Sequence, residues 1–129
     1  MKTCLVIDEY SVVRKIASRI LTLAGYAVHC AETPAEAISL MNSSGPIDLA
    51  LVSATLPDCP VDEAIRIVRS HRQAGEAVVL ASLVESHLGL MTRAKRAGAK
   101  GFVYRPFDRA SLTAWLAPYA GPQAAQADA

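Results

Sequence analysis

The side chains best suited to chemistry stand directly after short apolar runs of the sequence. The carboxylates of Asp8 and Glu9 follow the first run, Ser53 follows the third, Ser82 the fourth and Arg105 the fifth. Paired carboxylates can bind a hard cation such as Mg²⁺, and a guanidinium pairs with carboxylates. A hydroxyl becomes a good nucleophile only beside a base. If the runs are strands of one sheet, these groups converge on one pocket.

The elements that must position these groups alternate regularly along the chain. Short apolar runs predict buried strands over residues 3–7, 26–30, 47–52, 77–81 and 101–104. Helical spacing of apolar residues predicts helices from Val12 to a stop at Gly25, over 34–42, 61–72 and 86–97, and from a cap at Asp108 to Pro118. Thr33 opens a capping-box pattern before the second helix.

This alternation predicts an α/β fold in which helices cover both faces of a parallel sheet. We expect a flavodoxin-like, three-layer (βα)5 domain with strand order 2-1-3-4-5 over residues 1–118. Residues 119–129 are rich in Ala and Gln and are predicted to be a disordered tail. The working site of such a fold lies at the carboxyl ends of the strands, where the strand order reverses.

Composition narrows the possible partners. Charged residues make up 19% of the chain and the formal net charge is +1, so nucleic acid is an improbable partner. No apolar run reaches the roughly 18 residues of a membrane span, and we expect a cytoplasmic protein that is a monomer or a weak homodimer. Three cysteines without CxxC spacing predict neither a metal site nor a disulfide framework.

Four segments, taken together, resemble the receiver domains of bacterial response regulators. Residues 5–9 resemble the first strand of that family with its acidic pair, and residues 51–57 resemble the third strand with its following loop. Residues 80–82 resemble the strand that ends in a switch hydroxyl, and 97–107 resemble the fifth-strand segment that normally ends in Lys-Pro-Phe. Their order and spacing make the combined signal strong. The resemblance implies the chemotaxis-regulator fold over residues 2–117.

The resemblance also implies that the phosphate-accepting aspartate of the family is replaced here by Ser53. The family pocket would then be degenerate, and we assign to it a set of six residues: Asp8, Glu9, Ser53, Thr55, Ser82 and Arg105. Phe102 matches the aromatic residue of the family's switch. Ser82 and Phe102 could still report two states, or they could be a polar strand end and a half-buried aromatic residue.

The resemblance places a Mg²⁺ site at Asp8 and Glu9, but the third carboxylate is missing. We expect weak Mg²⁺ binding at best, no other cofactor, no catalytic residue and no enzymatic activity. Arg105 stands where the family has lysine. We expect it either to pair with Asp8 or Glu9, in place of the missing phosphoryl interaction, or to point to solvent.

A cluster of basic residues suggests where partners bind. Arg93, Arg96, Lys100 and Arg109 form a predicted docking face over the fourth helix, fifth strand and fifth helix, or else a solvated surface. We expect phosphorylation-independent binding of a histidine kinase, a phosphotransfer protein or an output protein. The alternative is regulation by Ser53 modification or by a small anionic ligand on the basic face. A flavodoxin-like cofactor carrier is a third possibility, but Asp8 and Glu9 would repel a flavin phosphate.

Overall fold

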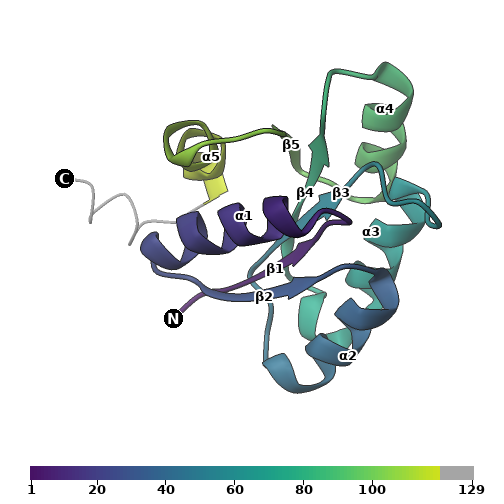
Figure 1. Cartoon of the computed structure of the whole chain (residues 1–129). Helices are drawn as coiled ribbons and strands as arrows, with labels where there is room; N and C mark the ends of the chain where they lie inside the picture. The colour runs from purple at the N-terminus through teal and green to yellow at the C-terminus, as the bar shows by residue number, and fades with distance from the viewer. Residues whose placement is uncertain (120–129) are drawn as a thin grey trace.

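The computed structural model describes residues 1–119 and contains one parallel sheet between two layers of helices (Figure 1). The strands are β1 (Thr3–Ile7), β2 (Ala27–Ala31), β3 (Leu49–Ser53), β4 (Val78–Leu83) and β5 (Gly101–Tyr104). The helices are α1 (Ser11–Leu23), α2 (Pro34–Ser44), α3 (Val61–Ser70), α4 (Leu88–Ala97) and α5 (Arg109–Leu116), with 3-10 helices η1 (Arg72–Ala74) and η2 (Ala117–Tyr119). The fold class predicted from the sequence is confirmed.

The strand order is β2-β1-β3-β4-β5, as predicted, and every pair is parallel. β1 lies between β2 and β3, with Ile7 paired to Ala31 on one side and to Val52 on the other. The chain therefore leaves β1 in one direction for β2 and returns across the sheet to β3. The carboxyl ends of β1 and β3 form the point at which the strand order reverses, where α/β folds place their sites.

Alternating side chains of the strands bury two separate apolar cores, one on each face of the sheet. Leu5 and Ile7 of β1 point into the core beneath α2, α3 and α4, together with Val52 and Ile65. The opposite core lies beneath α1 and α5 (Figure 1) and contains Cys4, Val6, Ala17, Leu21, Leu80, Val103, Leu112 and Leu116. No helix within residues 1–119 is long and apolar enough to cross a membrane.

Local sequence signals explain where several helices begin and end. The Thr33 hydroxyl accepts a hydrogen bond from the backbone N–H of Glu36 and so caps α2, as predicted. Asp108 caps α5 by accepting from the N–H of Ser111, whose side chain accepts in return from the N–H of Asp108. Gly98 ends α4 at φ 119°, a left-handed backbone conformation that glycine adopts without steric cost.

The predicted boundaries differ from the structure mainly at strand ends. Ser53 is the last residue of β3, and Ser82 lies inside β4, which continues to Leu83. Both serines were predicted to follow their strands. The predicted tail began one residue too early, because Tyr119 lies in η2 and donates a hydrogen bond to the carbonyl of Lys100. Residues 120–129, the rest of the predicted tail, lie outside the described residues.

Candidate functional site

The carboxyl ends of β1, β3, β4 and β5 bring together the residues that the sequence placed in one pocket. Strand pairing fixes their spacing, since Ser53 of β3 lies beside Ser82 of β4 and β1 precedes Asp8 directly. We call this set of six residues the strand-end pocket: Asp8, Glu9, Ser53, Thr55, Ser82 and Arg105. All six are connected by hydrogen bonds or ion pairs that the structure contains.

Asp8 forms the buried wall of the strand-end pocket and is only 2% exposed. Its backbone N–H continues the pairing with β2 by donating to the carbonyl of Ala31 at 3.0 Å. Its Oδ1 accepts from the N–H of Tyr10 at 2.9 Å, which leaves Oδ2 facing the pocket. The turn from β1 into α1 therefore fixes this carboxylate in place.

Glu9 accepts hydrogen bonds from the two hydroxyls of the β3 end. Ser53 Oγ donates to Glu9 Oε1 and Thr55 Oγ1 donates to Glu9 Oε2, both at 2.7 Å. Ser53 Oγ also accepts from the backbone N–H of Thr55 at 3.1 Å, a local turn that keeps the serine in register. Ser53 is fully buried, so these contacts satisfy its hydroxyl away from solvent.

Arg105 fills the centre of the strand-end pocket and is 5% exposed. Its Nη1 lies 3.2 Å from Asp8 Oδ2 and 3.6 Å from Glu9 Oε1. Its Nη2 donates to Thr55 Oγ1 at 2.9 Å and to the carbonyl of Ser82 at 3.2 Å. Of the two orientations left open by the sequence, the structure contains the carboxylate pair and not the solvent-facing side chain. The guanidinium contacts both acids singly and does not clamp either one with two prongs.

The pKa values of the two carboxylates are shifted in opposite directions. Burial raises the pKa of Asp8 above its ordinary value, and the Tyr10 N–H and Arg105 only partly offset that rise. Burial also acts to raise the pKa of Glu9, but the hydrogen bonds from Ser53 and Thr55, with Arg105 nearby, outweigh it and lower that pKa. Glu9 is therefore the more firmly ionised partner of the guanidinium.

Two buried polar atoms of the strand-end pocket have no hydrogen-bond partner within residues 1–119. They are Ser82 Oγ and Arg105 Nε. Ser82 contributes its backbone carbonyl to the pocket and not its hydroxyl. The carbonyl accepts hydrogen bonds from Arg105 and from the N–H of Ala54. Phe102 is half-buried beside this strand, and Lys95 Nζ lies 6.0 Å from the centre of its ring. Within residues 1–119 the Ser82 hydroxyl therefore makes no hydrogen bond that could link it to neighbouring elements.

The residues of the strand-end pocket do not fit a Mg²⁺ ion. Mg²⁺ needs nearly octahedral oxygen ligands, usually including one or two free carboxylates. Both Glu9 oxygens already accept from hydroxyls, and Asp8 Oδ2 already faces the Arg105 guanidinium. A second cation would meet this fixed positive charge. Within residues 1–119 there is also no cluster of three or more His, Cys, Asp or Glu that could hold a metal.

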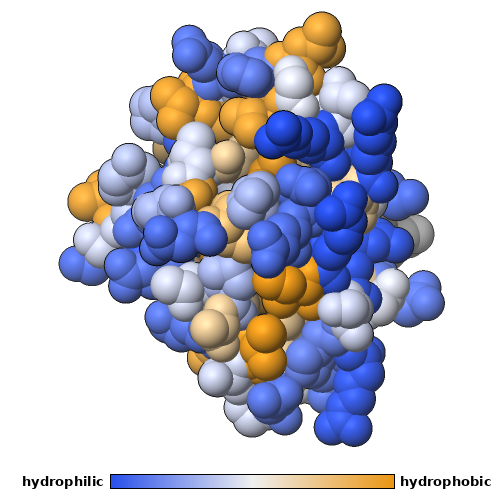
Figure 2. All heavy atoms as spheres, turned by 90° about the vertical axis from the view of Figure 1, so that its right-hand side faces the viewer, coloured by the Kyte–Doolittle hydropathy of each residue, from blue (hydrophilic) through white to orange (hydrophobic). Residues whose placement is uncertain are grey.

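The residues of the predicted basic docking face lie on α4, before the edge strand β5, and on α5. Arg93 and Arg96 are exposed on α4, which packs on α3, and Lys100 is exposed just before β5. Figure 2 views the layer of α2, α3 and α4, where hydrophilic side chains surround small apolar patches. Arg109 lies on α5, in the other helical layer, where it lines a groove against α1. β5 is the edge strand between α4 and α5, and a shared docking face at that edge stays a prediction.

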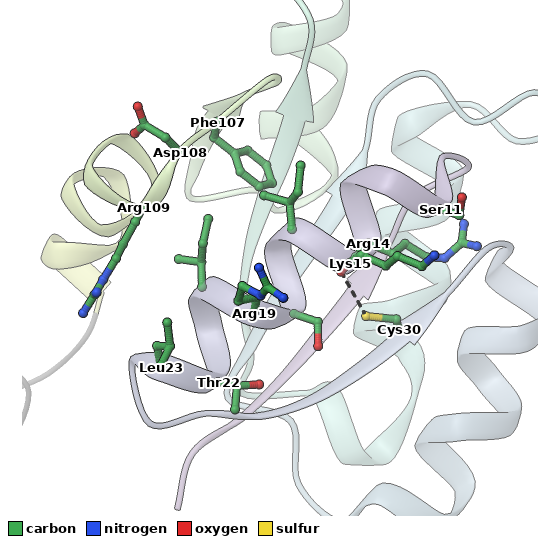
Figure 3. A pocket seen from close by; sticks show the side chains of 13 residues that line it. Ser11, Arg14, Lys15, Arg19, Thr22, Leu23, Cys30, Phe107, Asp108 and Arg109 are labelled. Carbon is green, nitrogen blue, oxygen red and sulfur yellow. Dashed lines mark hydrogen bonds between the residues drawn. The ribbon is translucent and has the colours of Figure 1, made fainter.

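That groove between α1 and α5 was missed by the sequence analysis. We define the α1–α5 groove by six of its lining residues: Lys15, Ile16, Arg19, Leu23, Phe107 and Arg109. Figure 3 shows Arg19 and Leu23 on α1 and Phe107 and Arg109 at the α5 side. The outward positions of apolar Ile16 and Leu23 on a helix whose opposite face is buried were the available signal.

Comparison with known proteins places the chain in a family. Residues 4–117 match the family model described as the response regulator receiver domain. Probable histidine kinase 6 of Oryza sativa subsp. japonica is 26% identical over 86% of this chain and 13% of its own length. Regulatory protein AtoC of Escherichia coli is 28% identical over 81% of this chain and 22% of its own length. The chain thus spans less than a quarter of these two relatives.

Solved structures share the fold. Chemotaxis protein CheY4 of Vibrio cholerae superposes with a TM-score of 0.84 at 24% identity, over 92% of this chain and 98% of that one. The receiver domain of sensor histidine kinase PA1611 of Pseudomonas aeruginosa, solved with magnesium in its active site cleft, gives a TM-score of 0.78 at 21% identity, over 94% and 98% of the two chains. At these identities the likeness extends to the fold alone.

Proposed function

This chain belongs to the response regulator receiver domain family, and on that premise we propose that it signals by binding partner proteins without first accepting a phosphoryl group. The family assignment makes it a receiver domain of two-component signal transduction, a class of domain that interacts with histidine kinases and related proteins. We infer that the partners of this receiver domain recognise one persistent conformation.

The observation that carries the proposal is the internal charge balance of the strand-end pocket. The Arg105 guanidinium faces both Asp8 and Glu9, at 3.2 Å and 3.6 Å. In a phosphorylated receiver, a metal ion and an incoming phosphoryl group would have to occupy such a cleft. Here the Arg105 side chain already supplies the positive charge, and this charge is a permanent part of the protein.

The chemistry of Ser53 supports the same proposal. A serine hydroxyl attacks a phosphorus centre only when a base takes its proton. Its hydrogen-bond acceptor is Glu9, and the lowered pKa of Glu9 makes that carboxylate a weak base. Asp8 has the raised pKa but makes no hydrogen bond with the Ser53 hydroxyl, whose partners are Glu9 and Thr55. Neither acid is therefore arranged to activate the serine.

Regulation by modification of Ser53 is less well supported. Ser53 is fully buried, with 0% of its surface exposed. Its Oγ donates a hydrogen bond to Glu9 and accepts one from the backbone N–H of Thr55. A modifying enzyme would have to open the end of β3 before reaching it. A small anion on the basic residues of α4 remains a separate prediction, which the strand-end pocket neither requires nor supports.

Phosphodonor labelling tests the proposal directly. The protein is incubated with Mg²⁺ and acetyl phosphate, and its intact mass is measured. We expect no phosphorylated species for the natural chain. The matched positive control is the double variant Ser53→Asp with Arg105→Lys, which restores the residue types that the family resemblance implies, and we expect it to gain a labile phosphoryl group. A phosphoryl group on Asp8, Glu9 or Ser53 of the natural chain would overturn the proposal.

A further inference from the structure

The start of α4 is capped by the side chain of a histidine. His87 is the N-cap residue, and its Nδ1 accepts a hydrogen bond from the backbone N–H of Leu90 at 3.1 Å. The first backbone bond of the helix follows, from the N–H of Met91 to the carbonyl of His87 at 2.9 Å. The Leu90 N–H belongs to the first turn, whose amides have no acceptor inside their own helix. The imidazole therefore satisfies a donor that α4 cannot satisfy by itself.

The surroundings of the imidazole ring favour this cap. A Cβ at Gly89 would lie 3.3 Å from His87 Cε1 and 3.5 Å from Nδ1, so the absence of a side chain at that position leaves room for the ring over the first turn. His87 is exposed, and solvent can therefore exchange protons with it. Because Nδ1 is the acceptor, the neutral ring must carry its proton on Nε2. The cap exists only in this one form of the side chain.

The other α-helices do not begin on a group that titrates near neutral pH. Thr33 caps α2 with a hydroxyl, and Asp108 caps α5 with a carboxylate whose pKa is lowered by its hydrogen bonds to Ser111. No side chain caps α1 or α3, and His71 caps only the three-residue η1. An imidazole in water takes up its second proton at about pH 6.5. Among the α-helices within residues 1–119, only α4 has a cap that a small change of pH could remove.

No charge is paired with His87 at the start of α4. The first turn contains no acid, and the charged residues of the helix are all basic: Arg93, Lys95 and Arg96. The charged or titratable groups of the same loop, of β5 and of α3 are Glu85, Tyr104, Asp62, Glu63, Arg66 and Arg69. Within residues 1–119 none of these makes a hydrogen bond or ion pair with the imidazole. A protonated ring would also lie at the positive end of the helix dipole.

The packing of α4 makes its cap important. Ala94 is the buried residue of this helix, whereas Leu90 and Met91 are only partly buried against the core. Leu88, the first residue of the helix, is 82% exposed. α3 is similar in length and buries four residues: Val61, Ala64, Ile65 and Val68. A short helix with little buried apolar surface depends more on the hydrogen bonds at its ends.

We propose that His87 is a pH-sensitive cap and that the first turn of α4 opens when this side chain takes up a proton. The proton binds Nδ1, so the Leu90 N–H loses its acceptor, and both ring nitrogens become donors. The positive ring then faces the positive end of the helix dipole. At neutral pH the cap is intact. In mild acid the α4 part of the predicted docking face changes.

This inference goes beyond the proposed function and does not rest on it. His87 lies outside the strand-end pocket, and the hydrogen bonds of Arg105 in that pocket do not involve α4. Proton uptake would give the domain an input that needs neither a phosphoryl group nor a metal ion. Partners that contact α4 would then bind differently in mild acid and at neutral pH.

The test is NMR spectroscopy of the full chain, enriched in ¹⁵N, between about pH 7.5 and about pH 5.5. Imidazole spectra at the higher pH should show His87 neutral, with its proton on Nε2. Hydrogen exchange of the Leu90 amide is measured over the same range and corrected for the pH dependence of exchange in an unfolded chain. We expect its protection to fall by about fivefold in acid, the effect of losing an N-cap. A neutral ring protonated on Nδ1, or constant protection of Leu90, would overturn the proposal.

Two substitutions of His87 separate the cap from other effects of acid. His87→Asn supplies a capping side chain that does not titrate, and the protection of Leu90 should then be independent of pH. His87→Ala removes the cap at every pH, and its Leu90 protection at neutral pH should match that of the natural chain in acid. Persistent pH dependence in His87→Asn, or full protection in His87→Ala, would contradict a histidine cap.

The matched control is His29→Gln. His29 lies on β2 and makes no hydrogen bond within residues 1–119, so this change removes a titrating imidazole without removing a cap. The pH dependence of Leu90 should be unchanged in this variant, and its loss would assign the effect to His29. The Asp8 amide, which donates to the carbonyl of Ala31, reports on the rest of the fold. Equal loss of protection at Asp8 and Leu90 would show general unfolding and would also overturn the proposal.

Discussion

Arg105 Nη1 lies 3.2 Å from Asp8 Oδ2, and the two side chains are 4% and 2% exposed. This pair joins the end of β1 to the residue after β5, across a sequence separation of 97 residues. Buried ion pairs contribute little net stability compared with apolar residues, because both charges lose their hydration. Removing one partner is costly, however, since the other charge is left buried without compensation. The pair is therefore better understood as fixing one arrangement of the strand-end pocket than as a large source of stability.

Replacing Arg105 should destabilise the domain strongly. We expect Arg105→Ala to lower the free energy of unfolding by about 3 to 5 kcal/mol, because Asp8 and Glu9 would be left without their cation. Arg105→Lys should cost less, since a lysine retains the charge but not all four contacts. Urea denaturation measures both. Arg109→Ala is the control on an exposed arginine and should change stability by less than about 0.5 kcal/mol. An Arg105→Ala cost as small as that would contradict the buried pair.

The two buried serines should respond differently to the same substitution. Ser53→Ala removes the donor to Glu9 and the acceptor of the Thr55 N–H, and should cost about 1 to 3 kcal/mol. Ser82→Ala removes a hydroxyl that has no partner within residues 1–119, and should be nearly neutral. Parallel denaturation curves check the comparison. A large loss for Ser82→Ala would show that its hydroxyl makes a contact that this arrangement lacks.

Acidification should destabilise the domain partly through Glu9. Its pKa is lower in the folded chain than its ordinary value, so the folded state favours the ionised form, and that stability is lost as the pH falls through the folded pKa. Asp8 acts in the opposite direction, because its raised pKa lets the folded state hold a proton more readily as the pH falls. Glu9→Gln should therefore lose less stability than the natural chain between neutral and acid pH. Glu9 is one cause of the raised pKa of Asp8, so Glu9→Gln also reduces the Asp8 contribution and makes the difference between the two chains smaller.

The measurement is urea denaturation of both proteins over a series of pH values. Glu85→Gln is a matched control, since Glu85 is an exposed glutamate in the loop after β4. Its pH dependence should follow that of the natural chain. Identical slopes for Glu9→Gln and the natural chain would show that the hydroxyl bonds to Glu9 do not favour its ionised form.

Restoring an acid at Ser53 should make the domain respond to Mg²⁺. Ser53→Asp places a third carboxylate where a hydroxyl now lies 2.7 Å from Glu9 Oε1, and we expect a loss of about 1 to 3 kcal/mol without metal. Saturating Mg²⁺ should then recover about 2 kcal/mol by binding only the folded state. Thermal unfolding with and without Mg²⁺ measures the recovery. The natural chain should show no such shift, and a comparable Mg²⁺ effect on it would refute the poor fit of its pocket.

The sequence alone determined the order of the elements and the edge at which the site lies. The apolar runs were short and continuous, which is the pattern of strands covered on both faces, and glycine, proline and capping residues separated them from the helices. These signals depend only on residues that are close together in the sequence, so they can be recognised without a structure. They also placed Asp8, Glu9, Ser53 and Arg105 at one end of the sheet, since parallel strands share that edge.

Only the tertiary structure decided how those groups are paired. Whether Arg105 faced solvent or Asp8 depended on the distance between the ends of β1 and β5, which no local pattern encodes. The same limit explains the basic residues, since Arg96 and Arg109 are near in sequence but lie on opposite layers of the sheet. The α1–α5 groove needed two helices far apart in the chain to become neighbours. The type and spacing of the side chains can be read from the local sequence. Contacts between distant segments arise only when packing brings those segments together.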